Sequence, residues 1–450
     1  MTFDFKKFIP HYGALIRLGT PLIIGQIGII IQNFADTLMI GHHSTPELAA
    51  AALVSNIFIL GVLMAMGFAL GLTPVIGSLY GREKTEEIGT TVKNGLVLNS
   101  MAALVLMMIY TVLYFFLDKL GQPKELLVYI RPYYIVNLIS IPFVCWFNSL
   151  KQTFDATTDT SIPMWILVIG NVQNIVGNWL LIYGVGGCPE MGLLGAGIST
   201  LAARIVMFVL IVAAFLWIGR YRDIRRAFRR SRVSLSEVTV LFAMGWPICL
   251  QMGMESGAWS LCSIIVGWIG TNALAGHQIM LTVSQLFFQV YYALASAVSI
   301  RVSLFHGQQD YHAIHLTTWA GVHLNFMIAV LVSVPIMLCR HEIGFLFTDN
   351  REVTELVSGA IIPLIIYQFS DGLQCSFSNA LRGLGDVKPL MKVAFISYFV
   401  VSLPVAYGLG ISCKHGLVGV WYSFPVGLTI AGALYYWYYR RRFLLLTSIR

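Results

Sequence analysis

Charge is the property that this sequence has least of. Only 11% of its 450 residues are Asp, Glu, Lys or Arg, while 57% are hydrophobic. Soluble globular proteins carry about 25% charged and roughly 45–50% apolar residues. A water-soluble chain of this length would need far more charge to cover its surface, and the disordered, collagen-like and disulfide-rich classes fail on the same composition. A polytopic membrane protein remains, in agreement with the mean hydropathy of +0.76.

Motifs for catalysis, nucleotide binding and metal binding are also missing. The chain has no Walker loop, no HExxH and no GxSxG, so neither ATP drive nor hydrolase chemistry is indicated. Its seven cysteines lack CxxC spacing and are interpreted as packing residues. His277 and His323 have no partners at ligand spacing, so packing or helix–helix hydrogen bonding is expected. We predict that the protein is not an enzyme and holds no cofactor.

Apolar runs long enough to cross a bilayer recur along the chain. A bilayer core of about 30 Å needs roughly 20 apolar residues per helix, and charge-free runs such as 95–117 and 393–413 reach that length. They lack the period-two alternation of barrel strands, so we predict an all-α integral membrane protein. Twelve transmembrane helices are expected near 14–40, 48–78, 93–117, 126–148, 162–184, 191–217, 238–267, 274–300, 313–338, 354–380, 389–411 and 416–439.

Most of the 29 basic residues fall on one side of this arrangement. With the N-terminus inside, the outer side holds only Lys119, Lys124, Arg131, Arg340, Arg351 and Lys414. The positive-inside rule then predicts that both termini are cytoplasmic. The Arg-rich stretch 220–232 lies in the longest cytoplasmic loop, and topology and anionic lipid headgroups explain it better than nucleic acid does. The N-terminal segment shows no signal-peptide pattern.

The two halves of the chain share short patterns at one constant offset. Pro21 aligns with Pro247, and Pro163 aligns with Pro389. Because each half holds an even number of spans, both halves enter the membrane from the same side, which predicts a parallel repeat around a central cavity. We expect an N-terminal six-helix bundle at 1–218, an Arg-rich cytoplasmic linker at 219–237 and a C-terminal six-helix bundle at 238–450.

Three acidic residues lie deep in predicted spans: Asp36, Glu255 and Asp371. An ionised and unpaired carboxylate is costly in hydrocarbon, so such residues normally face a bundle interior or a wet cavity and bind ions or protons. Arg204 is the one basic residue well inside a predicted span. Its long side chain can reach the membrane surface, which leaves the acids without an obvious basic partner.

Aromatic residues lie one helical turn from two of these acids. Trp259 follows Glu255 by four residues, and Tyr367 precedes Asp371 by four, so each pair shares a helix face. A carboxylate beside an aromatic face suits a large organic cation. A carboxylate beside hydroxyl and amide oxygens suits Na⁺, which is a hard cation.

Amide side chains accompany the third acid. Gln32 and Asn33 lie one turn before Asp36, and Asn174 and Asn178 share one face of a later span. This spacing allows the two asparagines to join Asp36 in a polar site. The alternative is that the amides only hold helices together by hydrogen bonds.

The chain resembles the multidrug and toxic compound extrusion (MATE) family, specifically its NorM-like bacterial branch. The stretches that carry the resemblance are TPLIIGQIGIIIQNFADTLMIG, NVQNIVGNW, ALAGHQ, AVSIRVS and IYQFSDGLQCSFSNALRGLGD. The resemblance implies two pseudo-symmetric six-helix bundles in a V with the substrate between them. It implies export of cationic, amphipathic drugs or dyes in exchange for Na⁺ or H⁺. We expect a monomer among the lipids of the bacterial inner membrane.

The resemblance also assigns roles to individual residues. The amino-lobe polar site of the family is matched by Asp36, Asn174, Asn178 and Thr200, and its carboxyl-lobe cation site by Glu255 and Asp371 with Tyr367 beside them. The expected coupling ion, Na⁺ or H⁺, binds at one of these two sites. The expected substrate cavity is lined by Trp259, Gln278, Gln285, Phe288 and Tyr292. Of these, Trp259 and the stretch 285–292 depart from the branch.

The expected mechanism is secondary antiport, in which the ion and the drug favour opposite conformations. The alternative is a lipid or lipid-linked-sugar flippase on the related superfamily fold. Such proteins tend to line their cavity with basic residues that bind phosphates, whereas the buried charges here are acidic and favour a cation. Carboxylates serve Na⁺ and H⁺ alike, and the NorM-like match leans toward Na⁺.

Overall fold

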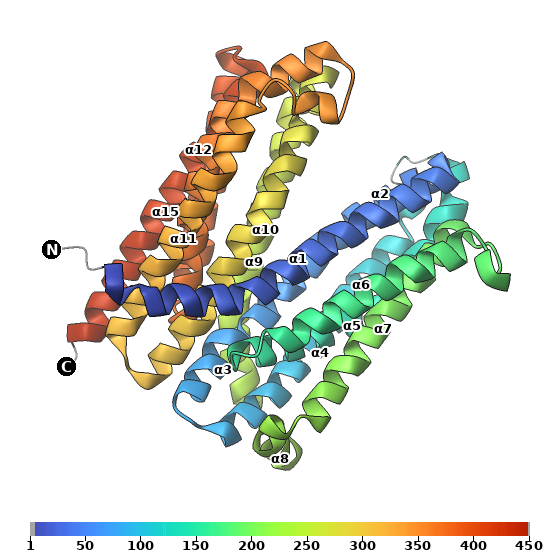
Figure 1. Ribbon diagram of the computed structural model, residues 1–450. Coiled ribbons are helices and arrows are strands. Elements are labelled where there is room, and N and C mark those ends of the chain that lie inside the picture. The colour runs from blue at the N-terminus through green and yellow to red at the C-terminus, as the bar shows by residue number, and fades with distance from the viewer. Residues whose placement is uncertain (1–4, 120, 122, 449–450) are drawn as a thin grey trace. The chain divides into compact units, whose positions relative to one another are not determined.

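A computed structural model describes residues 5–119, 121 and 123–448, and its regular elements there are all helices (Figure 1). The α-helices are α1 (Ile9–His43), α2 (Thr45–Leu70), α3 (Leu72–Gly81), α4 (Thr85–Tyr114), α5 (Leu127–Ala156), α6 (Ser161–Ile182), α7 (Gly192–Trp217), α8 (Arg222–Arg230), α9 (Leu235–Ile269), α10 (Thr271–Gln308), α11 (Tyr311–Leu338), α12 (Arg351–Gly383), α13 (Lys388–Ala394), α14 (Leu403–Tyr407) and α15 (Gly416–Ser448). Shorter 3₁₀ or π segments are η1 (Phe5–Lys7), η2 (Leu117–Lys119), η3 (Lys124–Leu126), η4 (Val185–Gly187), η5 (Gly219–Tyr221), η6 (Gly344–Leu346), η7 (Phe395–Ser402) and η8 (Gly408–Ser412).

Twelve helical segments of the described chain are long and apolar enough to cross a membrane. This confirms the predicted all-α fold and the number of spans. Several helices are longer than predicted: for example, α10 continues to Gln308 and α15 to Ser448, beyond the predicted ends at 300 and 439. Apolarity ends where the bilayer core ends, but a helix that begins in the membrane can continue into the polar region, so hydropathy underestimates its length.

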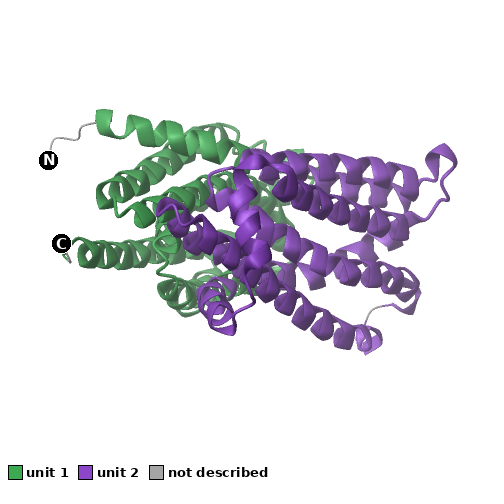
Figure 2. Ribbon diagram, turned by 90° about the horizontal axis from the view of Figure 1, so that it is seen from below, with its two compact units in different colours: residues 1–23, 250–450 green, residues 24–249 purple. Residues whose placement is uncertain are grey.

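The chain divides into two compact units (Figure 2). Unit 1 comprises residues 1–23 and 250–450, and unit 2 comprises residues 24–249. The boundaries therefore lie inside α1 and α9, two residues after Pro21 and Pro247, and not at the Arg-rich loop. Proline removes a backbone N–H and interrupts the helical hydrogen-bond ladder. The two halves of α1 and of α9 thus belong to different units.

Unit 2 is held together by close backbone approaches as well as by apolar side chains. Its second span breaks at Gly71, where α2 ends and α3 begins. A Cβ atom added to Gly71 would lie 2.9 Å from Cα of Gly245 in the first half of α9, and one added to Gly245 would lie 2.8 Å from Cα of Phe68. Only glycine leaves room for backbones this close, so the bend in the second span packs directly on α9.

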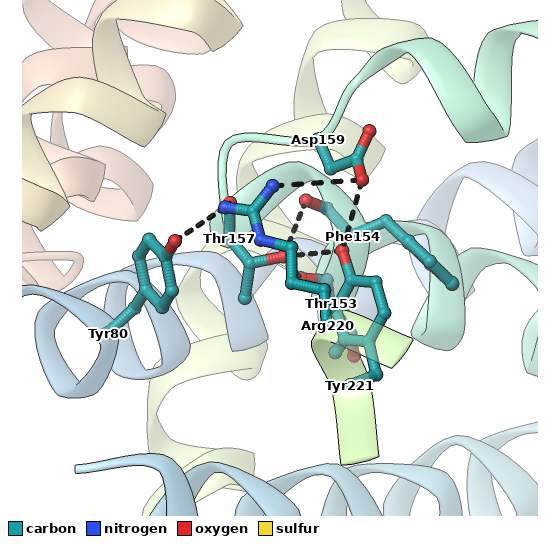
Figure 3. A network of polar contacts seen from close by, with 7 residues as sticks. All are labelled: Tyr80, Thr153, Phe154, Thr157, Asp159, Arg220 and Tyr221. Carbon is teal, nitrogen blue, oxygen red and sulfur yellow. Dashed lines mark hydrogen bonds and ion pairs between the residues drawn. The ribbon is translucent and has the colours of Figure 1, made fainter. Parts of the chain in front are cut away.

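The first residues of the Arg-rich segment pack against α3 and against the residues that follow α5 in unit 2 (Figure 3). Arg220 donates to the backbone oxygen of Thr157 at 3.0 Å and to the hydroxyl of Tyr80, and its guanidinium lies 3.9 Å from the Asp159 carboxylate. The buried Tyr221 hydroxyl lies 3.1 Å from Thr157 Oγ1 and donates to Asp159 at 3.5 Å. These contacts join η5 to α3 and to the end of α5, so the segment is a packed part of unit 2.

Unit 1 contains a span that is not a regular α-helix. Its eleventh span runs through α13, the π-helical η7, α14 and the π-helical η8. Pro404 lacks the N–H that would bond to Val400 in an α-helix, so the turns before it can widen. The η7 segment carries Tyr398, which is buried in unit 1.

The start of α1 and the end of α15 lie at the same end of unit 1 (Figure 1). His11 Nδ1 lies 2.8 Å from Thr317 Oγ1 in α11, while Phe443 packs on His315 one half-turn earlier in the same helix, with ring centroids 5.4 Å apart. An even number of spans requires such an arrangement. The extreme ends of the chain, 1–4 and 449–450, lie outside the described residues.

Candidate functional site

Two acidic side chains interact electrostatically inside unit 1. Asp371 of α12 is 1% exposed. Its Oδ1 lies 3.7 Å from the Sγ of Cys375, and within the described chain its buried Oδ2 has no hydrogen-bond partner. Glu255 of α9 lies near enough to interact electrostatically with Asp371. Repulsion between the two carboxylates is relieved when a cation or a proton enters between them.

Neutral oxygen atoms surround this carboxylate pair. Glu255 lies within hydrogen-bonding reach of Tyr398 and Gln374, and the Tyr398 hydroxyl donates to Gln374 Oε1 at 3.1 Å. The π-helical η7 places Tyr398, and α12 places Gln374 three residues after Asp371. Carboxylate, amide and hydroxyl oxygens are the ligands that a hard cation prefers.

An aromatic cluster forms one side of the same region. Trp259 stacks on Phe424 with ring centroids 4.1 Å apart and meets the edge of Tyr367 at 5.8 Å. Tyr367 is 3% exposed and also contacts Trp421. Sequence spacing placed Trp259 beside Glu255 and Tyr367 beside Asp371, and the structure brings all four into unit 1. Trp259 is half-buried within this cluster, and its predicted place in the substrate cavity stays a prediction.

His277 joins three helices behind the aromatic cluster. The Trp421 indole N–H donates to His277 Nδ1 at 3.2 Å, so the ring carries its proton on Nε2, which lies 3.0 Å from Ser263 Oγ. His323 likewise bonds the Tyr12 hydroxyl at 2.8 Å. Both histidines have the helix–helix hydrogen bonds that the sequence led us to expect.

Unit 2 holds the second predicted polar site. Asn178 Nδ2 donates to Asp36 Oδ1. With the Asn174 amide turned so that its nitrogen faces Asp36, that nitrogen donates to Oδ1 at 2.9 Å and its oxygen accepts from Thr200 Oγ1 at 3.1 Å. Both asparagines are fully buried, while Asp36 is half-buried. The helices α1, α6 and α7 thus bring together the four residues predicted for this site.

Arg204 points into unit 2 rather than toward the membrane surface. Its Nη1 donates to Ser140 Oγ in α5, and its charge interacts with Asp36 and Tyr133. The expectation that this side chain reaches the membrane surface is therefore not met. Among the ion pairs of the described residues none joins Arg204 to Asp36 directly, so the guanidinium acts on the carboxylate at longer range.

The remaining predicted cavity residues lie along α10. Gln278 and Gln285 are exposed and occur seven residues apart, which places them on one helix face. Phe288 and Tyr292 stack with ring centroids 5.8 Å apart on the next turns, and the buried Tyr292 hydroxyl has no partner within the described chain. This stripe is a continuous polar and aromatic surface, and its contact with substrate stays a prediction.

Sequence reasoning missed three buried charged residues because they lie near predicted span ends. Glu47 accepts the Leu193 N–H at 2.8 Å and pairs with His43 at 3.0 Å, and Asp155 pairs with Lys151 at 2.6 Å. Both acids are therefore paired.

The third missed residue is Arg382, assigned to the cytoplasmic side but only 3% exposed. Its Nη1 donates to Asn379 Oδ1 at 3.1 Å, and its charge interacts with Glu255. Asp371, Cys375, Asn379 and Arg382 follow one face of α12, a spacing that the sequence already contained. Across the described residues no group of three His, Cys, Asp or Glu side chains is placed to hold a metal.

Comparison with known sequences identifies relatives over the whole chain. The profile of the MatE family matches residues 21–180 and 247–408, and the two matches begin at the prolines that align in the internal repeat. The multidrug resistance protein NorM of Aliivibrio fischeri is 27% identical over 424 residues, covering 93% of this chain and 92% of the relative. NorM of Vibrio vulnificus strain YJ016 is 28% identical over 435 residues, covering 95% of each.

Solved structures show the same fold. An outward-facing multidrug resistance MATE transporter of the MOP superfamily matches with a TM-score of 0.89 at 20% identity, covering 97% of this chain and 96% of that one. A MOP-superfamily transporter from Pyrococcus furiosus, described as having a binding pocket of reversed polarity, matches with a TM-score of 0.86 at 19% identity, covering 97% of each. Because the family profile covers most of the sequence in two repeats, this chain belongs to the MatE family of membrane transporters.

Proposed function

We propose that this protein is a secondary multidrug efflux antiporter that exports cationic, amphipathic small molecules in exchange for inward Na⁺ or H⁺. The observation that carries the proposal is the Asp371 carboxylate, which is buried beside Glu255 with one oxygen left unpartnered within the described chain. A fold does not retain a costly buried charge without a role for it. The NorM relatives are named as multidrug resistance proteins, which supports the direction and the substrate class.

Coupling follows from differential binding. An ion that occupies the Glu255–Asp371 site stabilises the conformation in which these carboxylates lie together, and a bound drug stabilises the other conformation. Each ligand then lowers the affinity for the other. Asp36 with its buried asparagines provides a second acidic site in unit 2, to which the same reasoning applies.

The polarity of the buried charges separates this proposal from a lipid or lipid-linked-sugar flippase. A transporter of similar fold is described as having a pocket of reversed polarity and a different function, so the fold alone does not decide the substrate. Here the two candidate sites are built around carboxylates, Asp36 in unit 2 and the Glu255–Asp371 pair in unit 1, and carboxylates attract cations. The proposed location is the bacterial inner membrane, with a monomer whose two termini face the cytoplasm.

The test is dye efflux from proteoliposomes that contain the wild-type protein or one of three variants, Asp36→Asn, Glu255→Gln and Asp371→Asn. We expect loss of ion-coupled efflux in at least the two unit 1 variants. Thr429→Ala is a suitable control because Thr429 bonds Ser370 on α12 at 2.8 Å, outside the carboxylate pair. Near wild-type coupled efflux in all three acid variants would contradict the proposal.

A further inference from the structure

A basic pocket lies in unit 1 between α13 and the last turns of α15. The cavity measures about 260 Å³, and its polar lining consists of Asp386, Lys388, Lys392, Tyr438, Arg441 and Arg442. Pockets for drug-sized ligands measure roughly 300–1,000 Å³, so the cavity is small for a transported drug. It lies apart from the Glu255–Asp371 site, at the turn between α12 and α13 and the last turns of α15.

Two helix faces build this pocket. Lys388 and Lys392 lie one turn apart on α13, and Tyr438, Arg441 and Arg442 lie at helical spacing on α15. The Tyr435 hydroxyl donates to the backbone oxygen of Leu390 at 3.1 Å. This bond fixes the last turns of α15 against α13, so the basic residues face each other in a defined geometry.

The positive charge of the pocket is not balanced by the protein. Four basic side chains surround one carboxylate, Asp386. None of the ion pairs found between described residues includes any of them. The Nε of Arg442 is buried and has no partner within the described chain. Converging cations with a desolvated and unsatisfied donor indicate an anionic ligand with several acceptor oxygens, such as a phosphate.

The residues around the pocket indicate the source of that phosphate. The Arg441 guanidinium lies over the Trp437 ring, with its Cζ 5.8 Å from the ring centroid, and Trp437 is 52% exposed. The apolar Leu444 and Leu445 are 55% and 50% exposed. Exposed aromatic and apolar side chains beside Arg and Lys are typical of the headgroup level of a membrane. A soluble phosphate would gain nothing from these apolar neighbours, whereas a lipid contacts them with its glycerol and acyl chains.

We propose that this pocket binds the phosphate of an anionic phospholipid in the leaflet that faces the cytoplasm. Basic pockets between transmembrane helices on that side favour anionic headgroups. The bound phosphate offsets the repulsion among the four cations and holds α13 against α15. The proposal rests on the proposed orientation of the chain but not on ion-coupled drug export, so either can fail without the other.

The experiment measures lipid binding to the full-length protein in detergent by native mass spectrometry, with short-chain phosphatidylglycerol or phosphatidylcholine as the probe. We expect phosphatidylglycerol to bind wild type more tightly than phosphatidylcholine. The double variant Lys392→Gln/Arg442→Gln should bind phosphatidylglycerol roughly 20-fold more weakly, because each basic residue near an anionic surface contributes about fivefold. The charge-preserving variant Lys392→Arg/Arg442→Lys should keep most of the affinity, which separates lost charge from lost folding.

A matched control removes the same charge elsewhere. Arg440 and Arg230 are exposed and lie outside the pocket, so Arg440→Gln/Arg230→Gln should bind phosphatidylglycerol about as well as wild type. Equal loss in this control, or equal binding of the two lipids, would overturn the proposal. In a second arm inorganic phosphate is added to lipid-free protein. Protection of wild type against thermal unfolding by phosphate as strong as that by phosphatidylglycerol would reassign the pocket to a soluble anion.

Discussion

Asp371 differs from the other buried acids of the described residues because it has no ion pair with a basic side chain. Glu47 and Asp155 are buried too, but each pairs with a basic side chain at 3.0 Å or less. Asp371 belongs to none of the ion pairs found between described residues, and the charge that acts on it is that of another carboxylate, Glu255. Paired acids hold helices together, whereas an unpaired acid beside a second acid is a place for a mobile cation or proton.

Replacing this carboxylate should separate function from stability. Asp371→Asn removes the ion ligand and should abolish coupled efflux. It should also raise the free energy of unfolding by about 1 kcal/mol or more, because an unsatisfied buried charge is replaced by a neutral amide of the same shape. Thermal unfolding and dye efflux of one preparation check both outcomes. Loss of stability together with loss of transport would instead assign Asp371 a structural role.

Arg382 should set the number of ions that the site accepts. Two ionised carboxylates and one buried guanidinium together carry a net charge of minus one. A single monovalent cation would neutralise this charge. Two unit charges about 10 Å apart interact by roughly 1.7 kcal/mol at an effective dielectric constant of about 20. We therefore expect Arg382→Gln to tighten Na⁺ binding roughly 17-fold or to let a second ion bind, as measured by isothermal titration calorimetry. Arg382→Lys keeps the charge and serves as the control; unchanged Na⁺ binding in Arg382→Gln would contradict this role.

At the scale of the element, two features of the spans matter most. The long helices α1 and α9 pass from one unit to the other just after Pro21 and Pro247. The π-helical η7 carries Tyr398 to the neighbourhood of Glu255. The unit boundaries follow Pro21 and Pro247 by two residues, whereas η7 ends two residues before Pro404. Each of these prolines removes a backbone hydrogen bond. Proline therefore has a structural consequence in the spans that carry the candidate site.

The contact between α2 and the first half of α9 should tolerate no added atom. A Cβ on Gly67 would lie 2.4 Å from Cα of Cys249, so Gly67→Ala should destabilise unit 2 by about 1–3 kcal/mol, as overpacking does. Gly257 in α9 has no atom within 4 Å of its added Cβ. There the better helix propensity of alanine should stabilise the protein by up to about 1 kcal/mol. Thermal unfolding of both variants measures these changes in stability. Equal changes in the free energy of unfolding would contradict the close approach of α2 to α9.

The sequence predicted elements better than it predicted their irregularities. Apolar runs determine spans directly, because the bilayer excludes any long segment that is not apolar and helical. Helical spacing also placed Asn178 on the face that meets Asp36. The passage of α1 and α9 between units depends on packing between segments far apart in the chain. No local pattern encodes such contacts, so the sequence did not predict them.

At the scale of the whole molecule, the duplicated sequence and the family profile describe the same repeat. The profile matches once from residue 21 and once from residue 247, and the units change at residues 23 and 249. The ends of α1 and α15 both contact α11, so the first and last helices lie at one end of unit 1. The distribution of basic residues predicts that this end faces the cytoplasm.

This orientation can be tested with the native cysteines. Cys188, Cys339 and Cys413 lie in loops predicted to face outward, and the last two are exposed, whereas Cys145, Cys249, Cys262 and Cys375 are buried. A membrane-impermeant maleimide should label intact right-side-out membranes at Cys339 and Cys413. The Cys339→Ser/Cys413→Ser variant should lose most of that labelling. Labelling only in inverted vesicles would reverse the proposed topology.

The measurement that tests the central claim most directly is dye efflux with Na⁺ and proton gradients imposed one at a time. Proteoliposomes would hold wild-type protein or Asp371→Asn at equal density. We expect at least one inward cation gradient to drive cationic dye out of wild-type vesicles, and we expect Asp371→Asn no longer to respond to it. Efflux that proceeds at the same rate with neither gradient, or a full response of Asp371→Asn to both, would contradict ion-coupled export through Asp371.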